Sequence, residues 1–383
     1  MGFKQYNDHR VGATRLLVYG VYRVEGELNF HTLTLVANLA LPLMLLLFFQ
    51  AVKNNASRWI YLLVAALLLF NLKFYTLLLM SQAAFAYFWV VLYAFAAIFA
   101  LHRVTVPKFF LAAVFCTLSS FSLASGQIAW LLGLVTLIHQ SLLRKDRSFL
   151  FPLLWLFVSV AMLLVWRWGF VADIAQTPSK ELLAILPDYV GNAQLAEKIQ
   201  RYFTFFLAFT GSALVNFSAL GASIAGLAML TLLVYFSYKS LYESDIRLVL
   251  CCWFAVATLA AVTSGRALMV EPETVLHARY NFFSVVLLCP LVILTLVRFN
   301  VFRSYGAYIV VALSLGYAAS TWREHQEPLR VGMSSLHDYF NRDLYPVAGK
   351  TRNPRGIVYE AIAAGVYIPP CRPYPVCTDA EGR

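Results

Sequence analysis

A short polar run, Asn7-Asp8-His9-Arg10, is the first feature of the chain that could do chemistry. A carboxylate beside a guanidinium can act as general base on an acceptor hydroxyl or bind a divalent metal ion. Asp8 is therefore the candidate catalytic residue, with His9 and Arg10 as substrate contacts. The alternative is a solvated tail in which Asp8 only caps the helix that follows.

The loop 265-279 is a second candidate site, because Arg266 and Arg279 bracket it and Glu271 lies between them. Guanidinium groups bind phosphate oxygens bidentately, so this pair predicts a clamp for a phosphate or a diphosphate. Tyr280 joins the clamp as a substrate contact. In the alternative, Arg279 and Tyr280 only anchor the next span at the membrane interface.

A third candidate lies at the outer end of the predicted span 59-80. Lys73 in this position could meet a lipid phosphate, and Gln82 could hydrogen-bond a sugar or a head group. The alternative for Lys73 is that its ammonium group simply extends to the membrane interface.

The composition indicates what must position these residues. The 383-residue chain is 61% hydrophobic and 13% charged, whereas a soluble domain is about 45–50% apolar and about 25% charged. The predicted fold class is therefore an all-α polytopic membrane protein. Ten apolar runs are long enough to span a bilayer: 31-52, 59-80, 83-101, 109-124, 127-143, 149-168, 219-238, 247-264, 280-298 and 305-321. A further stretch, 201-215, is shorter and is predicted to be re-entrant or interfacial.

The charges of the short loops predict the topology. With both termini outside, the five cytoplasmic loops contain 11 of the Lys and Arg residues and three acids, as the positive-inside rule requires. The formal net charge of +11 thus sets orientation, and nucleic acid is excluded as a partner. The transmembrane domain is 31-321, and the outer segments are 1-30 with an interfacial helix over 11-24, 169-218, 265-279 and a small C-terminal segment, 322-383.

The cysteines agree with this topology. Cys371 and Cys377 lie in the proline-rich sequence PPCRPYPVC on the predicted outer side, where disulfides persist. A disulfide between them is the preferred interpretation, and two free thiols are the alternative. The other four cysteines lie in predicted spans, where a thiol usually behaves as a small hydrophobe.

The acids disfavour one functional class. All 19 Asp and Glu residues lie outside the predicted spans, whereas ion-coupled transporters and proton relays commonly need an ionisable group at membrane depth. A non-enzymatic lipid or glycan translocator stays open.

The order of five motifs resembles a group of bacterial polytopic membrane proteins that are similar to GT-C-type glycosyltransferases. The likeness covers about residues 7 to 321 and rests on NDHRVGATRLL (7-17), NLKFYTLLLMSQ (71-82), SGQIAWLLGLVTL (125-137), GRALMV (265-270) and HARYNFFSVVLL (277-288). The resemblance implies a GT-C-like fold and a sugar donor linked to polyprenyl phosphate, used on the outer face of the membrane.

On this chain, the resemblance makes Asp8 the acid that serves the acceptor or a metal ion. It makes Arg266 and Arg279 the ligands of the departing lipid phosphate, with Lys73 as an additional contact. The expected function is transfer of a sugar to an envelope glycan, lipid or protein acceptor at the outer face of a bacterial inner membrane. The alternatives are an O-antigen polymerase or ligase and a translocator.

Overall fold

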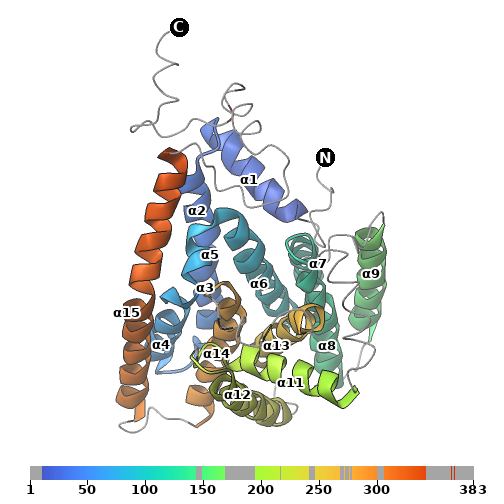
Figure 1. Cartoon of the computed structure of the whole chain (residues 1–383). Helices are drawn as coiled ribbons and strands as arrows, with labels where there is room; N and C mark the ends of the chain where they lie inside the picture. Colours follow the sequence, from blue (N-terminus) through green and yellow to red (C-terminus); the bar gives the residue numbers. More distant parts are fainter. Residues whose placement is uncertain are drawn as a thin grey trace.

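The computed structural model describes residues 11-143, 149-168, 195-215, 217-240, 246-267, 271, 276, 278-299, 306-341, 364 and 366. Every regular element within these residues is a helix. Figure 1 shows the long helix α15 along one side of the bundle, with α1 lying across its upper end.

The helices are numbered in chain order. In order they are α1 (Gly12–Glu25), α2 (Phe30–Asn38), α3 (Ala40–Val52), α4 (Arg58–Leu69), η1 (Leu72–Phe74), α5 (Tyr75–Leu79), α6 (Ser81–Leu101), α7 (Val106–Ser120), η2 (Ala124–Gln127), α8 (Ile128–Leu143), α9 (Leu150–Arg167), α11 (Leu195–Gly211), α12 (Ala219–Ser240), α13 (Arg247–Arg266), α14 (Ala278–Arg298) and α15 (Gly306–Asn341).

Eight helical segments of the described chain are long and apolar enough to cross a membrane. They are α2 with α3, α4 with α5, α6, η2 with α8, α9, α12, α13 and α14. Two predicted spans are not among them. The span 109-124 corresponds to α7, an apolar helix of 15 residues, and the span 305-321 is the first part of the 36-residue helix α15. The predicted class, a multi-pass helical membrane protein, is confirmed, while ten spans remains a prediction.

The predicted helix over 11-24 is found as α1. It ends at Gly26, whose φ of 80° is a left-handed conformation that glycine adopts at no steric cost. The Ala13 N–H donates a 2.9 Å hydrogen bond to the Phe121 carbonyl oxygen, which ties α1 to the end of α7. Leu16 and Tyr19 stay more than half exposed. These exposed side chains favour a position of α1 at the membrane interface.

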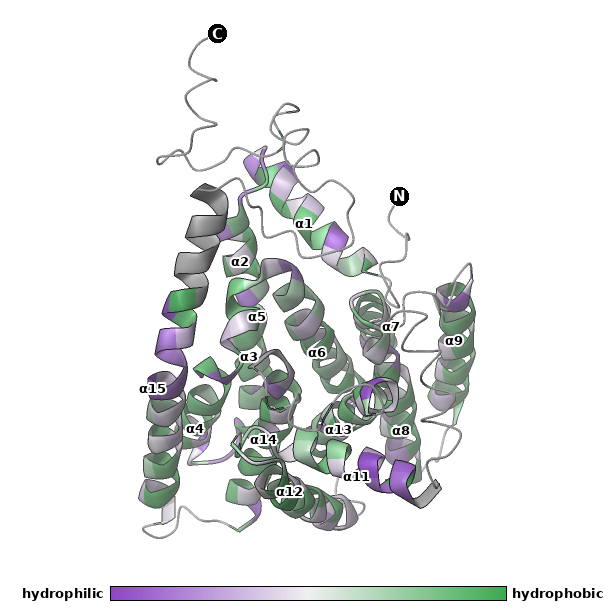
Figure 2. Ribbon diagram, in the orientation of Figure 1, coloured by the Kyte–Doolittle hydropathy of each residue, from purple (hydrophilic) through white to green (hydrophobic). Residues whose placement is uncertain are grey.

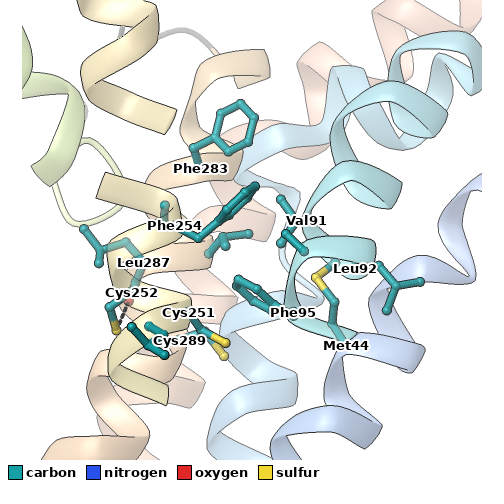
Figure 3. Packing of buried hydrophobic residues seen from close by; sticks show 14 of the residues in the cluster. Met44, Val91, Leu92, Phe95, Cys251, Cys252, Phe254, Phe283, Leu287 and Cys289 are labelled. Atoms are coloured by element: carbon teal, nitrogen blue, oxygen red, sulfur yellow. Dashed lines mark hydrogen bonds between the residues drawn. The ribbon is translucent and has the colours of Figure 1, made fainter. Parts of the chain in front are cut away.

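Aromatic side chains from α6 and α14 form the centre of the bundle. The Phe282 ring lies 4.7 Å from Phe88 and 5.2 Å from Phe74, measured between ring centroids, in tilted and edge-on arrangements that aromatic pairs prefer. Figure 3 shows the neighbouring apolar layer, where Phe95 and Phe254 pack edge to face. Segments far apart in sequence are therefore held together at η1, α6 and α14.

Four cysteines lie in this apolar interior, as expected. Cys116, Cys251, Cys252 and Cys289 are fully buried free thiols. Figure 3 shows Cys251, Cys252 and Cys289 among apolar side chains, and the Cys252 Sγ lies 3.9 Å from the Leu287 carbonyl oxygen. Their packing is that of small hydrophobic residues.

Two tryptophans of α9, Trp155 and Trp166, attach it to the bundle. Trp166 Nε1 donates a 3.1 Å hydrogen bond to the Ser120 carbonyl oxygen. Trp155 is fully buried and its Nε1 donates a 2.9 Å hydrogen bond to the Trp130 carbonyl oxygen. Gly133 makes room for it, because a Cβ there would lie 2.6 Å from the Trp155 ring. Only 17% of the α9 span is buried, so its remaining apolar side chains face outward.

We therefore expect Trp155→Ala to lower the free energy of unfolding by about 3 kcal/mol, since a large buried ring is replaced by a cavity. Leu153→Ala is the matched control, because Leu153 is 64% exposed on the same helix. Thermal melting of both purified variants checks the prediction. Equal melting temperatures for the two variants would contradict it.

Helices α11 and α12 pack with backbone against backbone. A Cβ on Gly226 would lie 2.1 Å from the Leu207 carbonyl oxygen, and one on Gly211 would lie 1.9 Å from the Ala222 carbonyl oxygen. Small residues allow this close approach of membrane helices. Residues 201-211 of the predicted stretch 201-215 thus belong to the 17-residue helix α11, which begins at Leu195 and is paired with α12.

Candidate functional site

A break within the span Arg58–Leu79 positions Lys73. Asn71 caps η1: its Oδ1 accepts a 2.7 Å hydrogen bond from the Lys73 N–H, and its Nδ2 donates to the Leu68 carbonyl oxygen. Lys73 is 2% exposed. The sequence predicts Lys73 at the outer end of its span, but the structure places it at an internal break.

The first turn of α14 and the middle of α15 meet this break. Asn281 Nδ2 donates to the carbonyl oxygens of Leu276, at 3.1 Å, and of Lys73, at 3.5 Å. From α15, the His325 ring lies 5.6 Å from the Tyr75 ring between centroids. Figure 2 shows hydrophilic residues on α15 at about the height where α4 ends. Polar side chains from α14 and α15 therefore lie beside this break.

Tyr280, the residue before Asn281, faces a different set of neighbours. Arg266, at the end of α13, donates a hydrogen bond from Nη1 to the Tyr280 hydroxyl, and its guanidinium carbon lies 5.2 Å from the ring centroid. The Phe209 ring packs edge-on against Tyr280, with centroids 6.0 Å apart. Tyr280 is 4% exposed, whereas Arg266 is exposed. The tyrosine thus holds an accessible guanidinium at the start of α14.

A second arginine, Arg201 of α11, contacts the same region. Arg201 Nε donates a 2.8 Å hydrogen bond to the Ala267 carbonyl oxygen, and Arg201 Nη2 lies 3.1 Å from Glu271 Oε1. We call Arg201, Arg266, Glu271 and Tyr280 the arginine cluster. It brings together residues of the loop 265-279 with α11, which the sequence does not predict to be near it.

The charges of the arginine cluster suit an anion. The cluster contains two guanidinium groups and one carboxylate, and the positive end of the α14 dipole is adjacent. Glu271 is 73% exposed on its side chain, and exposed ion pairs contribute little to stability. The Arg201–Glu271 ion pair is therefore a weak one.

The predicted site residues have different outcomes. The structure brings Arg266 to Tyr280 and joins Glu271 to the same cluster through Arg201. Gln82 is exposed in the first turn of α6, and Arg279 lies in the first turn of α14, with its side chain outside the described residues. Asp8, His9, Arg10, Cys371 and Cys377 also lie outside the described residues.

Two residues of this region are absent from the sequence predictions. Arg201 is the only charged residue in the stretch 201-215, and a lone base at the start of an apolar segment is the signal that could have identified it. Asn281 directly follows Tyr280, which the sequence already identifies as a candidate substrate contact.

The described residues contain no group of three or more His, Cys, Asp or Glu side chains arranged to hold a metal ion. A divalent metal at Asp8 stays a prediction. Comparison of the chain with protein-family models, curated proteins and solved structures finds no match.

His325 predicts a dependence of stability on pH. Burial lowers the pKa of His325 from its ordinary value of 6.5, and Lys73 also lowers it, while Glu324 acts in the opposite direction. Folding therefore favours the neutral imidazole. The stabilisation is present above about pH 6.5 and is lost as the pH falls through the lower pKa of the folded protein.

We expect the melting temperature of the wild type to fall more than that of His325→Gln between pH 7.5 and 5.5. Thermal melting across this range is the measurement, and His31→Gln, at an exposed position on α2, is the control. Parallel pH profiles for wild type and His325→Gln would show that His325 does not titrate in this way.

Proposed function

We propose that the protein is a membrane glycosyltransferase that takes a sugar from a polyprenyl-phosphate-linked donor. The observation that carries the proposal is the arginine cluster: Arg266 of α13 bonds to Tyr280 in the first turn of α14, and Arg201 of α11 bonds to Ala267, the residue after Arg266. The acceptor is an envelope glycan, lipid or protein at the outer face of a bacterial inner membrane.

Phosphate binding is the first part of the proposal. Arg266 is exposed and is held by Tyr280, so its remaining N–H groups are available to phosphate oxygens. Arg201 is 26% exposed on its side chain and exchanges Glu271 for the ligand. Two guanidinium groups and a helix N-terminus together provide more positive potential than either feature alone.

Stabilisation of the leaving group is the second part. As the bond between the sugar and the phosphate breaks, negative charge develops on the departing polyprenyl phosphate. Donors that are fixed before the reaction stabilise this charge without reorganising. The hydrogen bond from Arg266 to a nearly buried tyrosine supplies such fixation. In this proposal Asp8 receives the proton of the acceptor hydroxyl, and the sugar is transferred to the acceptor oxygen.

Binding of polyprenyl phosphate tests the proposal without knowledge of the sugar. The purified protein in phosphatidylcholine nanodiscs is titrated with polyprenyl phosphate, and intrinsic tryptophan fluorescence reports the dissociation constant. We expect Arg266→Gln to raise this constant about tenfold, because one charge-assisted contact to phosphate is lost. An unchanged constant would remove the arginine cluster from the proposed mechanism.

A cellular experiment tests the reaction itself. The envelope glycans of cells that lack the gene are compared with those of cells rescued by wild type, Asp8→Ala or Arg266→Gln. We expect wild type to restore the missing glycan and both variants to fail at equal protein levels. Full rescue by both variants would exclude the enzyme proposed here.

A further inference from the structure

The turn between α3 and α4 has an exposed basic surface without a carboxylate. Lys53 follows α3 directly and is exposed, and Arg58 is the first residue of α4 and is half-buried. The sequence contains no Asp or Glu from residue 28 to residue 145. Within the part of the chain that the structure describes, neither base forms an ion pair. Residues near in sequence therefore do not neutralise these two charges.

Hydrogen bonds give this turn a fixed shape. The Asn55 N–H donates a 2.8 Å hydrogen bond to the Val52 carbonyl oxygen, and Asn55 Oδ1 accepts a 3.0 Å bond from the Ser57 N–H. Asparagine side chains commonly stabilise turns in this way. The Arg58 N–H bonds to the Asn55 carbonyl oxygen at 3.2 Å. The backbone thus sets the positions of Lys53 and Arg58 before any ligand binds.

The Arg58 guanidinium is held on two sides. Its Nη1 donates a 3.1 Å hydrogen bond to the Lys53 carbonyl oxygen, and its central carbon lies 5.7 Å from the centroid of the Trp59 ring. The Trp59 ring stacks on Phe49 of α3, with centroids 5.5 Å apart and planes 29° apart. Nη2 makes no hydrogen bond within the described residues, so it is available to an anion.

An apolar surface continues from this aromatic pair along both helices. Trp59 is 64% exposed, and Leu63, one turn further along α4, is 47% exposed. Leu46, one turn before Phe49 on α3, is 57% exposed. Residues three or four apart lie on the same face of a helix, and tryptophan is enriched where head groups meet hydrocarbon. Positive charge, an interfacial ring and apolar side chains therefore follow one another in the order of a phospholipid's phosphate, glycerol and acyl chains.

We propose that Lys53, Arg58 and Trp59, which we call the basic turn, bind the head group of an anionic phospholipid. The Arg58 guanidinium and the Lys53 ammonium contact the phosphate on the open surface of the turn, and the Trp59 ring lies at the level of the glycerol. The topology predicted from the loop charges puts the turn on the cytoplasmic side, where anionic lipids attract bases near the membrane surface.

The basic turn is separate from the proposed donor site. It lies at the end of the span Arg58–Leu79 that is opposite to α5, and Lys73 lies between the two ends. The lipid stays intact in this proposal, and its binding does not depend on a transfer reaction.

Quenching of Trp59 fluorescence by brominated lipids tests the proposal. The purified full chain is placed in vesicles of phosphatidylcholine with increasing fractions of phosphatidylglycerol, and one lipid at a time carries bromine on its acyl chains. Subtracting the emission of Trp59→Phe isolates the Trp59 signal from that of the other tryptophans. We expect phosphatidylglycerol to bind beside Trp59 more tightly than phosphatidylcholine. Lys53→Gln and Arg58→Gln should each lower this preference about fivefold, which is the effect of one base near an anionic surface.

Lys108→Gln is the matched control, because Lys108 is an exposed base in the first turn of α7 and belongs to the same predicted cytoplasmic side. It should leave the lipid preference at Trp59 unchanged. Equal losses for Lys53→Gln and Lys108→Gln would show that the general charge of this side attracts the lipid, and would overturn a site at the turn. Equal quenching by the two lipids in the wild type would also overturn it.

Arg58→Lys covers the case in which Arg58→Gln disturbs the turn. It keeps the positive charge, so most of the lipid preference should remain. A loss as large as that of Arg58→Gln would show that Arg58 acts through the shape of the turn, and would overturn its contact with the phosphate. Because no sugar donor is present in these vesicles, a negative result leaves the proposed glycosyltransferase standing.

Discussion

Replacing Gly226 with alanine is expected to lower the free energy of unfolding by about 3 kcal/mol, at the upper end of the range for overpacked sites. The new methyl group would lie 2.1 Å from the Leu207 carbonyl oxygen and 3.0 Å from the Gly211 nitrogen. Both atoms belong to the backbone and cannot turn away as a side chain can. Helices α11 and α12 must therefore separate along their whole contact.

The effect reaches the arginine cluster, because α11 carries Arg201 and Phe209. Arg201 bonds to the Ala267 carbonyl oxygen, and Phe209 packs against Tyr280. A shift of α11 thus loosens both contacts at the start of α14. We expect Gly226→Ala to bind polyprenyl phosphate more weakly, even at a temperature where the protein stays folded.

Thermal melting of purified Gly226→Ala and Gly265→Ala checks this prediction. Gly265 is the matched control because it lies in helix α13 and a Cβ there meets nothing within 4 Å. Its alanine variant should melt at or slightly above the wild-type temperature, since alanine favours helix more than glycine. If Gly226→Ala also melts like wild type, the close packing of α11 and α12 is wrong.

Features that depend on local composition were predictable from the sequence. Apolar length identifies membrane helices because the bilayer sets the same requirement for each segment. The spans that begin at Phe30, Ser81 and Arg247 start and end within a few residues of the predicted spans 31-52, 83-101 and 247-264. The amphipathic helix α1 was also predictable, because apolar residues that recur at helical spacing share one face.

Features that depend on tertiary packing were not predictable. Asn71 breaks its span by bonding to Leu68 and Lys73, which hydropathy cannot register because the surrounding run stays apolar. Arg201 belongs to the arginine cluster through α11, whose close packing on α12 depends on Gly211 and Gly226. Asn281 bonds to the Lys73 and Leu276 carbonyl oxygens while the adjacent Tyr280 contacts Arg266, because adjacent helix residues point in different directions.

The second large effect concerns the rate of sugar transfer. We expect Arg266→Gln to lower kcat by about 10²–10³-fold, the usual effect of removing one donor that stabilises transition-state charge. Arg266→Lys should recover only part of the rate, because an ammonium group lacks the bidentate geometry and the flat contact with Tyr280. Tyr280→Phe keeps the ring but removes the hydroxyl that holds Arg266, so its loss should be smaller.

Release of polyprenyl phosphate from glucose- and mannose-linked donors measures this rate in nanodiscs. Arg330→Gln is the matched control, since Arg330 is 79% exposed on its side chain and pairs with Glu327 three residues away on the same helix. A loss of kcat greater than the loss of binding would indicate that Arg266 acts mainly on the transition state. If Arg266→Gln kept a rate within threefold of wild type while Arg201→Gln lost activity, the leaving-group contact would belong to α11, and Arg266 would only position Tyr280.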